Sequence, residues 1–357
     1  MLMNSPKHLS ICIATMNRAA FIGATLESII SQATDEVEIV VVDGASADNT
    51  ELVLQRYQQR FPRLRYFRQD VNRGVDRDYS RTVELAQGDY CWFMSDDDAL
   101  KPGAIRTVLN QIEHNYSLII VNAEARNFDL SEVLDRQRLY ISADKVYKPG
   151  NAEALFIETA EHVSFIGSVV IRRSIWNARE KEAYFGTRFV HVGVIFQRPL
   201  LENTLVIAEP LVMVRFGNEG SWKANAFEVW MFKWPELIWS FAGFSDAAKD
   251  HVVRREPWRK LRALLIYRAW GVFSKTEYTR WIASRDAPRL FKLAARIIAG
   301  LPVCAVAVAT VAYLSLFYRK SRILEYEVRH SRIWKDCFKW LQPKKQGDGV
   351  AREKSAL

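Results

Sequence analysis

Asp89-Tyr90-Cys91-Trp92-Phe93-Met94-Ser95-Asp96-Asp97-Asp98 decides the fold, because here a short apolar strand runs directly into three consecutive carboxylates. Carboxylates crowded at a strand end repel one another by about 4 kcal/mol per pair at an effective dielectric of about 20. Either their pKa values rise or a cation joins them. Hard oxygen ligands favour Mg²⁺ or Mn²⁺, and Mg²⁺ commonly takes only one or two protein carboxylates beside water and substrate phosphate. The alternative is a solvated acidic turn that caps a helix beginning near Pro102.

The first hundred residues alternate between short apolar runs and helical patterns. Residues 9–14 and 37–42 are rich in Ile and Val, and a polar turn follows each run. Apolar residues then recur at helical spacing, which predicts two helices that face the core. This alternation is typical of an α/β fold with a doubly wound, mostly parallel sheet. The helical positions are Phe21, Leu26, Ile29 and Ile30 in the first helix and Leu52, Val53, Tyr57 and Phe61 in the second.

Three polar clusters stand at the points where predicted strands end. They are Thr15-Met16-Asn17-Arg18, residues 43–50 and the Asp triplet. In open α/β sheets, ligands bind outside the carboxyl ends of the strands. We therefore expect the three clusters to converge on one edge of the sheet and to form a ligand site there.

Four motifs follow one another along this region: Ile13-Ala14-Thr15-Met16-Asn17-Arg18, Val42-Asp43-Gly44-Ala45-Ser46-Ala47-Asp48-Asn49-Thr50, Asn72-Arg73-Gly74 and Phe93-Met94-Ser95-Asp96-Asp97-Asp98. In order and spacing they resemble the family 2 glycosyltransferases, which have the nucleotide-diphospho-sugar transferase (GT-A) fold. The resemblance covers residues 8–125 and continues more thinly to Trp222. Within that thinner part, Val214-Arg215-Phe216-Gly217-Asn218 is similar to the Arg-bearing loop that often closes these sites. The resemblance implies single displacement with inversion.

The resemblance also implies roles for individual residues. Asp97 would hold Mg²⁺ or Mn²⁺ together with Asp98, and the cation would stabilise the nucleoside diphosphate as it leaves. The family often has an Asp where this chain has Ser95, and Asp96 or Asp98 would share contacts with ribose, metal-bound water or the donor sugar. The residues expected to bind substrate are Thr15, Asn17, Arg18, Asp43, Ser46, Asn72, Gly74, Arg77, Asp78, Asp96 and Arg215.

Several of these residues have a structural alternative. Asp43 could accept a hydrogen bond from the base or ribose, or it could organise an Asx turn with Ser46. Asp48 or Asn49 could cap the following helix. Gly74 would allow a positive φ in the turn Asn72-Arg73-Gly74. The charged side chains of Arg73, Arg77 and Asp78 could form ion pairs at the surface or contact the sugar nucleotide.

Transfer also requires a base that removes the proton of the acceptor hydroxyl. Members of the family usually supply an Asp or Glu from the second half of the domain, and the expected acidic pair is missing here. His191 takes that place, because its unperturbed pKa suits general-base work near neutrality. A His among apolar neighbours is more often a core residue, and Glu180 and Glu182 are the alternative bases.

The composition fits one catalytic domain with an appendage. The chain has 357 residues and a formal net charge of +9, which favours polyanions or acidic membranes as partners. Its four cysteines, Cys12, Cys91, Cys304 and Cys337, lack metal-binding or redox spacing, which predicts a reducing cytosol and no disulfide framework. Residues 1–7 are polar and lead straight into a strand, so we expect no cleaved signal peptide.

Residues 223–342 interleave aromatic and basic side chains at helical, amphipathic spacing. This pattern favours a membrane interface, and no nucleic-acid recognition motif accompanies it. Residues 297–318 are charge-free and long enough to span a bilayer, but basic residues flank them on both sides. We therefore expect a re-entrant or in-plane hairpin, with a single span or a buried helix as alternatives. The predicted organisation is a catalytic domain at 1–222, a helical membrane-associating region at 223–342 and a mobile tail at 343–357.

Further motifs narrow the resemblance: Gly74-Val75-Asp76-Arg77-Asp78-Tyr79, Phe165-Ile166-Gly167-Ser168 and Phe189-Val190-His191-Val192-Gly193, together with the Ser-Asp-Asp-Asp ending. They are similar to bacterial abequosyltransferase-type enzymes of O-antigen assembly. The implied function is metal-dependent transfer of a sugar, such as a dideoxyhexose, from a CDP-, UDP- or dTDP-linked donor to a polyprenyl-diphosphate-linked oligosaccharide. The enzyme would work at the cytoplasmic face of the bacterial inner membrane as a peripheral or monotopic protein.

Two other functions share some of these features. A sugar-nucleotide pyrophosphorylase has the same fold and metal, but it needs a Gly-rich loop with Arg or Lys after the first strand. Ala14-Thr15-Met16-Asn17-Arg18 is not such a loop. A non-catalytic membrane scaffold that binds nucleotide sugars would tolerate loss of the Asp triplet.

Overall fold

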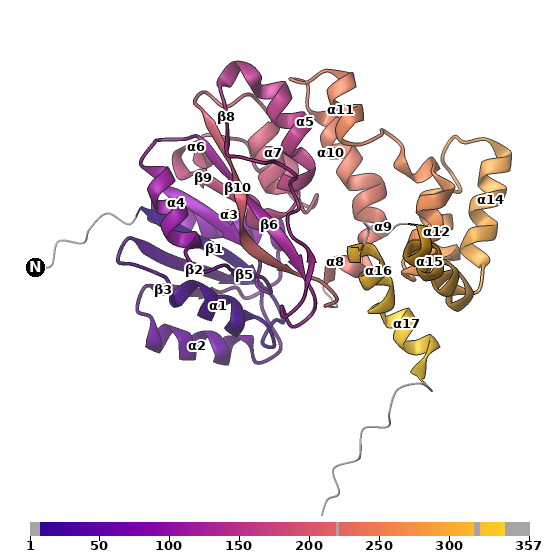
Figure 1. Ribbon diagram of the computed structural model, residues 1–357, viewed down its shortest axis with the longest axis horizontal. Coiled ribbons are helices and arrows are strands. Elements are labelled where there is room, and N and C mark those ends of the chain that lie inside the picture. The colour runs from indigo at the N-terminus through magenta and orange to yellow at the C-terminus, as the bar shows by residue number, and fades with distance from the viewer. Residues whose placement is uncertain (1–7, 219–220, 318–321, 340–357) are drawn as a thin grey trace, which may run out of the picture.

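A mixed β-sheet flanked by helices forms the N-terminal part of the protein (Figure 1). The computed structural model describes residues 8–218, 221–317 and 322–339. The strands are β1 (Leu9–Thr15), β2 (Val37–Asp43), β3 (Leu64–Arg68), β4 (Tyr90–Met94), β5 (Ala99–Leu100), β6 (Leu118–Arg126), β7 (Val133–Asp135), β8 (Lys145–Tyr147), β9 (Val169–Arg172) and β10 (Thr204–Arg215).

Helices connect most of these strands and make up most of the described chain after β10. Within the sheet domain they are α1 (Ile22–Ile30), α2 (Thr50–Arg60), α3 (Val75–Leu85), α4 (Ala104–Ile112), α5 (Ala152–Val163), α6 (Arg173–Asn177) and α7 (Val190–Phe196). After it they are α8 (Ser221–Ala224), α9 (Ala226–Glu228), α10 (Trp234–Ser240), α11 (Asp246–Val252), α12 (Leu261–Ala269), α13 (Lys275–Trp281), α14 (Arg289–Gly300), α15 (Val303–Phe317), α16 (Arg322–Arg329) and α17 (Arg332–Cys337).

The strand order is β3-β2-β1-β4-β9-β6-β10-β5, with β7 beside β6 and β8 beside β10. The first four strands of this order are parallel, as the alternating pattern predicts. In contrast, β9 is antiparallel to both β4 and β6, and β5, β7 and β8 add further antiparallel pairs. Strands β6 and β10 are parallel to each other, so the prediction of a mostly parallel sheet holds for the first four strands and for this pair, and it is wrong for β9, β5, β7 and β8. Apolar runs show that a strand is buried on both faces, but they do not fix its direction.

Two apolar cores lie on the two faces of the sheet. Side chains alternate along each strand, so Ile11 and Ile13 face one core whereas Cys12 and Ala14 face the other. Helices α1, α2 and α4 cover the first face, and α3, α5, α6 and α7 cover the second. The predicted helical positions pack as expected except Leu52, which is half exposed on α2, and Phe21, which lies just before α1 and contacts Phe128 outside the two cores.

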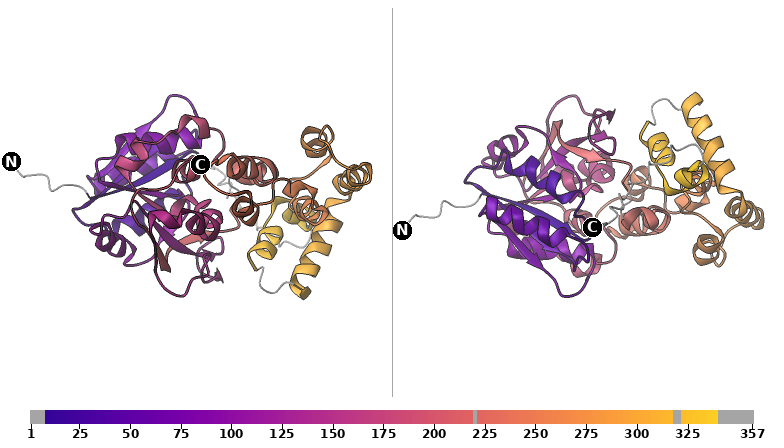
Figure 2. Two further views of the ribbon diagram at one scale, coloured as in Figure 1. Left: turned by 90° about the horizontal axis from the view of Figure 1, so that it is seen from above. Right: turned by 90° about the horizontal axis from the view of Figure 1, so that it is seen from below.

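Helices α12 to α17 form a lobe beside the sheet domain, and both views of Figure 2 show the lobe beyond the sheet. The packing is continuous between the two parts. Val229, Trp234 and Ile238 join a core of the sheet domain, whereas Phe227 and Phe232 pack in the core of the lobe. The segment just after the predicted boundary at residue 222 therefore connects both cores.

No single helix in the described ranges is both long and apolar enough to cross a membrane. Helices α14 and α15 would meet that test only together, and they are bent by 101° at the break between them. Pro302 lies at this break, where its missing N–H and fixed φ interrupt a helix. Tyr318, which ends the predicted apolar stretch, lies outside the described residues, as do residues 1–7 and the tail at 343–357.

Cys304 and Cys337 form a disulfide between α15 and α17. The prediction of a chain without disulfides is wrong for this pair. The two cysteines are 33 residues apart in the sequence, and they meet because α15 and α17 pack together. Cys12 and Cys91 are free and buried in the neighbouring strands β1 and β4.

Candidate active site

A cavity of about 770 Å³ lies at the carboxyl ends of β1 and β4. Because these strands are neighbours, the polar clusters that follow them meet as predicted. The third cluster, at residues 43–50, stays outside the cavity lining. The lining consists of Ala14, Thr15, Met16, Arg18, Asn72, Arg73, Gly74, Val75, Asp76, Arg77, Asp78, Tyr79, Ser95, Asp96, Ser164, Ile166, Phe185, Gly186, Arg188, His191 and Lys233.

The loops after β1 and β2 are joined by hydrogen bonds. Asn17 has a φ of 56°, and its side-chain oxygen accepts the Ala47 N–H at 2.7 Å. The Asn17 N–H donates to the Ser46 hydroxyl at 2.8 Å, and the Arg18 N–H donates to the Thr50 hydroxyl at 2.8 Å. Asn17 and Ser46, both predicted to bind substrate, thus support the cavity without lining it.

Two aspartates of this region have their carboxylates engaged within the protein. Asp43 is fully buried and accepts hydrogen bonds from the Ser46 N–H at 2.8 Å and the Tyr66 hydroxyl at 2.9 Å. It also accepts the Ser46 hydroxyl at 2.6 Å, which completes the Asx-type turn given as the structural alternative. Asp48 accepts the Thr50 N–H at 2.9 Å in an Asx-type turn just before α2, and the N-cap residue, Asn49, makes no side-chain cap hydrogen bond, so the predicted cap is not formed. Neither residue lines the cavity.

The three aspartates after β4 are buried. Arg18 lies beside them, with Nε 3.4 Å from Asp96 Oδ1 and Nη2 3.2 Å from Asp97 Oδ2. Burial and the nearby charge of Asp97 raise the pKa of Asp96 despite Arg18, and the same two causes raise the pKa of Asp98. The alternative of a solvated turn that caps a helix is wrong, because α4 begins only at Ala104 and without a side-chain cap.

Asp97 and Asp98 have different partners. Asp97 Oδ2 also accepts a hydrogen bond from the Asn218 amide, and Oδ1 accepts one from the Ser95 hydroxyl. Asp98 Oδ1 accepts the Arg215 N–H of β10 at 2.8 Å. The Arg215 guanidinium donates through Nε to the backbone oxygen of Asp97 at 2.7 Å, so Arg215 fixes the backbone of the triplet from outside the cavity.

The carboxylate oxygens of this triplet are suitable ligands for a divalent cation that also binds a substrate. Buried carboxylates with raised pKa values and one guanidinium form a cluster whose negative charge a cation would neutralise. Among the residues that the structure describes, no group of three His, Cys, Asp or Glu side chains could hold a metal by itself. A Mg²⁺ or Mn²⁺ site completed by diphosphate and water needs only one or two carboxylates. Asp97 and Asp96, which share Arg18, are the carboxylates closest to positive charge, whereas Asp98 contacts β10.

The turn before α3 and the first turn of α3 form one wall of the cavity. Gly74 has the predicted positive φ, at 90°, and its N–H donates to the Asn72 side-chain oxygen at 2.8 Å. The Arg77 guanidinium lies 4.4 Å from the centre of the Phe185 ring, a cation–π contact. Burial raises the pKa of Asp78 to about 6. The structure thus brings the four substrate-binding residues predicted for this segment into the cavity lining.

Asp76 connects this wall to the loop before α7, a role that the sequence did not indicate. Its carboxylate accepts the N–H groups of Gly186 and Arg188 at 2.8 Å each and that of Val190 at 3.1 Å. Burial raises the pKa of Asp76, and these three hydrogen bonds oppose the rise. An acidic residue in the first turn of a helix is common, so no local signal reveals partners 110 to 114 residues later.

His191 lines the cavity from α7 and is buried. Its Nε2 donates to the Val163 carbonyl oxygen at 2.9 Å, whereas Nδ1 has no hydrogen-bond partner among the described residues. Burial lowers the pKa of His191 to about 4, so the imidazole is neutral at pH 7 and weakly basic. The alternative bases, Glu180 and Glu182, are exposed and lie outside this cavity lining.

Lys233 reaches the cavity from the segment between α9 and α10. Its Nζ donates to the Gly186 carbonyl oxygen at 2.8 Å and lies 3.2 Å from Glu228. With Lys233, five basic residues line the cavity beside three aspartates, and this excess of positive charge suits an anionic ligand such as a diphosphate. The interleaved aromatic and basic pattern around Lys233 indicates a membrane surface, so no local signal places Lys233 in the site.

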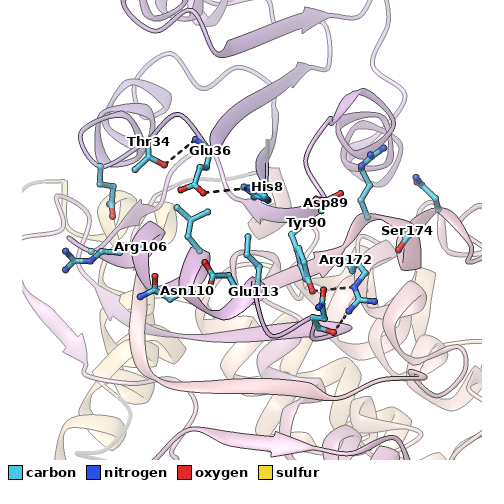
Figure 3. A pocket seen from close by; sticks show the side chains of 17 residues that line it. His8, Thr34, Glu36, Asp89, Tyr90, Arg106, Asn110, Glu113, Arg172 and Ser174 are labelled. Atoms are coloured by element: carbon cyan, nitrogen blue, oxygen red, sulfur yellow. Dashed lines mark hydrogen bonds and ion pairs between the residues drawn. The ribbon is translucent and has the colours of Figure 1, made fainter. Parts of the chain in front are cut away.

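Another cavity, of about 910 Å³, lies at the opposite edge of the sheet, near the start of β1 and β4 (Figure 3). His8 and Glu36 lie 3.8 Å apart in it, and Arg172 pairs with Glu202 at 2.5 Å. Its lining contains three arginines and three acidic residues, so it has no excess charge. Ligands of open α/β sheets bind at the carboxyl edge, which favours the cavity beside the Asp triplet as the active site.

Comparison with known proteins shows which family the first half of the chain matches. Residues 10–179 match glycosyl transferase family 2. Abequosyltransferase RfbV of Salmonella typhimurium is 29% identical over 228 residues, which cover 59% of this chain and 67% of that protein. The GalNAc(5)-diNAcBac-PP-undecaprenol beta-1,3-glucosyltransferase of Campylobacter jejuni is 30% identical over 115 residues, which cover 32% of this chain and only 37% of that protein.

Among solved structures, S. aureus TarS in complex with UDP-GlcNAc has a TM-score of 0.52 and 16% identity, over 92% of each chain. This likeness supports the fold. The match to the family covers the carboxyl end of β1, the turn before α3 and Asp96, which line the cavity, as well as Asp97 and Asp98, which stand behind the lining. Residues 10–179 of this chain therefore form a glycosyltransferase domain of family 2.

Proposed function

We propose that this enzyme transfers a sugar, with inversion, from a CDP-, UDP- or dTDP-linked donor to a lipid-linked oligosaccharide in surface polysaccharide synthesis. The observation that carries the proposal is the cavity at the carboxyl edge of the sheet, where five basic residues stand beside a buried carboxylate cluster. Similarity to an abequosyltransferase supports a dideoxyhexose as the sugar. Similarity to a glucosyltransferase named for an undecaprenol-linked glycan supports a polyprenyl-diphosphate acceptor.

In this proposal the basic side chains of the cavity bind the donor diphosphate. Arg18 leaves the carboxylates for a phosphate oxygen, because a guanidinium can bind either group in the same bidentate way. A divalent cation held by Asp97, with Asp98 as the predicted second ligand, would supply Lewis-acid stabilisation of the leaving nucleoside diphosphate. Arg77 lies on the wall of α3 and is available to the same anion.

His191 is the proposed base for the acceptor hydroxyl. The Val163 carbonyl oxygen holds the Nε2–H, so Nδ1, which is buried and has no partner among the described residues, is the nitrogen that would take the proton once the acceptor reaches it. Three hydrogen bonds from the loop before α7 to Asp76 hold His191 at the cavity, because they fix the residues just before it. The base therefore approaches from the second half of the domain, whereas the Asp triplet belongs to the first.

A donor screen tests the proposal. We expect one CDP-, UDP- or dTDP-sugar to raise the unfolding temperature with Mg²⁺ or Mn²⁺, because a ligand that binds only the folded state stabilises it by about 2.7 kcal/mol at a hundred times its Kd. GDP-sugars are the control. Thermal shifts that are the same for every nucleotide, or that persist unchanged in EDTA, would contradict the proposed donor site.

We also propose that α14, at the outer edge of the lobe, binds an anionic membrane surface (Figure 1). Leu290 and Leu293 are 82% and 57% exposed, and with the exposed Ile297 they form a stripe at helical spacing. Arg289 and Arg296, also exposed, stand next to this stripe. Apolar side chains beside exposed arginines suit the headgroup region of anionic lipid, and an in-plane α14 would bring the enzyme to a membrane-held acceptor.

Flotation with phosphatidylglycerol vesicles tests this surface. Because burying one Leu side chain contributes about 1.5 to 3 kcal/mol, we expect Leu290→Glu/Leu293→Glu to lower vesicle binding by at least about a hundredfold. Leu201→Glu is the matched control, since Leu201 is 89% exposed but lies between α7 and β10 in the sheet domain. Equal binding by the double variant and the wild type would refute the α14 surface.

A further inference from the structure

Helix α16 reaches back from the lobe to the sheet domain (Figure 1). Its Glu327 is only 2% exposed. Glu327 Oε1 accepts the Gly217 backbone N–H at 2.8 Å, and Oε2 lies 2.9 Å from Lys223 Nζ. The hydrogen bond joins α16 to the turn at Gly217, and the ion pair joins the same carboxylate to α8. Removing one member of a buried ion pair leaves an uncompensated charge.

Tyr326 adds a second contact to the same turn. Its hydroxyl accepts the Phe128 N–H at 3.0 Å. Its ring lies so close to Gly217 that a Cβ there would come within 2.8 Å of a ring carbon. Gly217 also has a φ of 87°, a conformation that favours glycine. The position and shape of this turn therefore depend on α16.

The residue after this glycine reaches the active site. Asn218 is buried, and its amide donates to Asp97 Oδ2. The same oxygen lies beside Arg18. A continuous series of contacts thus leads from Glu327 through Gly217 and Asn218 to Asp97.

We propose that Glu327 is a positioning residue of this glycosyltransferase. By holding the Gly217 turn, it directs the Asn218 amide to Asp97 and so fixes the orientation of the carboxylate that binds the cation. The inference rests on the proposed function, which gives Asp97 that role. Groups that orient a metal-binding carboxylate through hydrogen bonds commonly change metal affinity by about 10- to 100-fold when they are lost. The C-terminal lobe then serves the catalytic centre as well as any membrane surface.

Glu327→Met in the full chain is the test, with two measurements, because Met keeps the length of the side chain but cannot accept the Gly217 N–H. Hydrogen exchange over residues 211–218 should show that the Gly217 amide loses protection. Mn²⁺ binding, followed by electron paramagnetic resonance in the presence of CDP or UDP, should weaken by about tenfold. Glu327→Met/Lys223→Met removes both buried charges and the acceptor of the Gly217 N–H, so it should show the same weakening while the unfolding temperature stays closer to that of the wild type.

Glu132→Gln is the matched control. Glu132 forms an exposed ion pair at 2.6 Å with Arg322, which belongs to α16 as Glu327 does. This pair lies away from the contacts that lead to Asp97. This variant should keep the exchange pattern and the Mn²⁺ affinity of the wild type. Unchanged Mn²⁺ affinity in both Glu327 variants, or an equal loss in Glu132→Gln, would overturn the positioning role. A wild type that binds no Mn²⁺ with either nucleotide would instead refute the proposed function.

Discussion

Asp97→Asn is expected to lower sugar transfer by at least about a hundredfold, the size of effect seen when one stabilising group for transition-state charge is removed. Asn keeps the shape of the side chain and can still accept the Asn218 amide, but it lacks the charge that a divalent cation requires. The rate is measured as nucleoside diphosphate release from the donor chosen by the thermal screen, with washed membranes as the acceptor source. A Mn²⁺ titration of the same variant should show that the metal response has gone.

Asp98→Asn is the informative comparison for Asp97→Asn. The oxygen of the new amide can still accept the Arg215 N–H, so the anchor to β10 remains. If Asp98 is the second ligand, its variant should lose the Mn²⁺ response as well; if it only anchors β10, the response should persist. Wild-type turnover and metal dependence in Asp97→Asn would contradict the assignment of the metal to this triplet.

His191→Ala is expected to lower transfer by about 10²- to 10⁴-fold, the usual contribution of a general base. Donor binding should stay intact, because the donor contacts proposed here come from Arg18 and the α3 wall. Since burial lowers the pKa of His191 to about 4, the base is already deprotonated at neutral pH. The wild-type kcat/KM should therefore be level between about pH 6 and 8 with respect to this group, and should fall only as pH drops toward 4.

His162→Ala is the matched control. His162 is also buried with a pKa lowered to about 4, and its Nε2 bonds to the Val121 carbonyl oxygen at 2.9 Å, but it does not line the cavity. Both variants lose a buried ring and should lower the unfolding temperature. Only His191→Ala should lower transfer in the fraction that remains folded. Normal turnover in His191→Ala, or an equal loss in both, would remove His191 as the base.

The parts of the site that the sequence predicts well are those that follow local patterns. The strand that ends at Met94 could be recognised from its apolar run, and the carboxylates after it could be placed at a strand end because ligand sites lie there. The positive φ of Gly74 also follows from the turn around it. Each of these inferences uses only residues that are neighbours in the chain.

The details that sequence reasoning missed depend on partners far away in the chain. Asp43 has the residue type of a ligand, but Ser46 and Tyr66 engage its carboxylate. Asp76 looks like an ordinary first-turn acid until the loop before α7 folds onto it. Lys233 looks like part of a membrane-facing helix until the cavity closes around it.

By itself, the sequence determined the parallel half of the sheet, the turn chemistry and the gathering of acidic and basic residues at one edge, because apolar periodicity and strand ends are properties of short segments. Only the tertiary structure decided which of these residues face the cavity, that β9 runs antiparallel, that Cys304 meets Cys337, and that Glu327 supports the turn next to Asp97. Those outcomes depend on the packing of segments far apart in the chain. That packing is the one that buries the apolar side chains and pairs the buried polar groups of the whole chain, so a short sequence pattern cannot predict it.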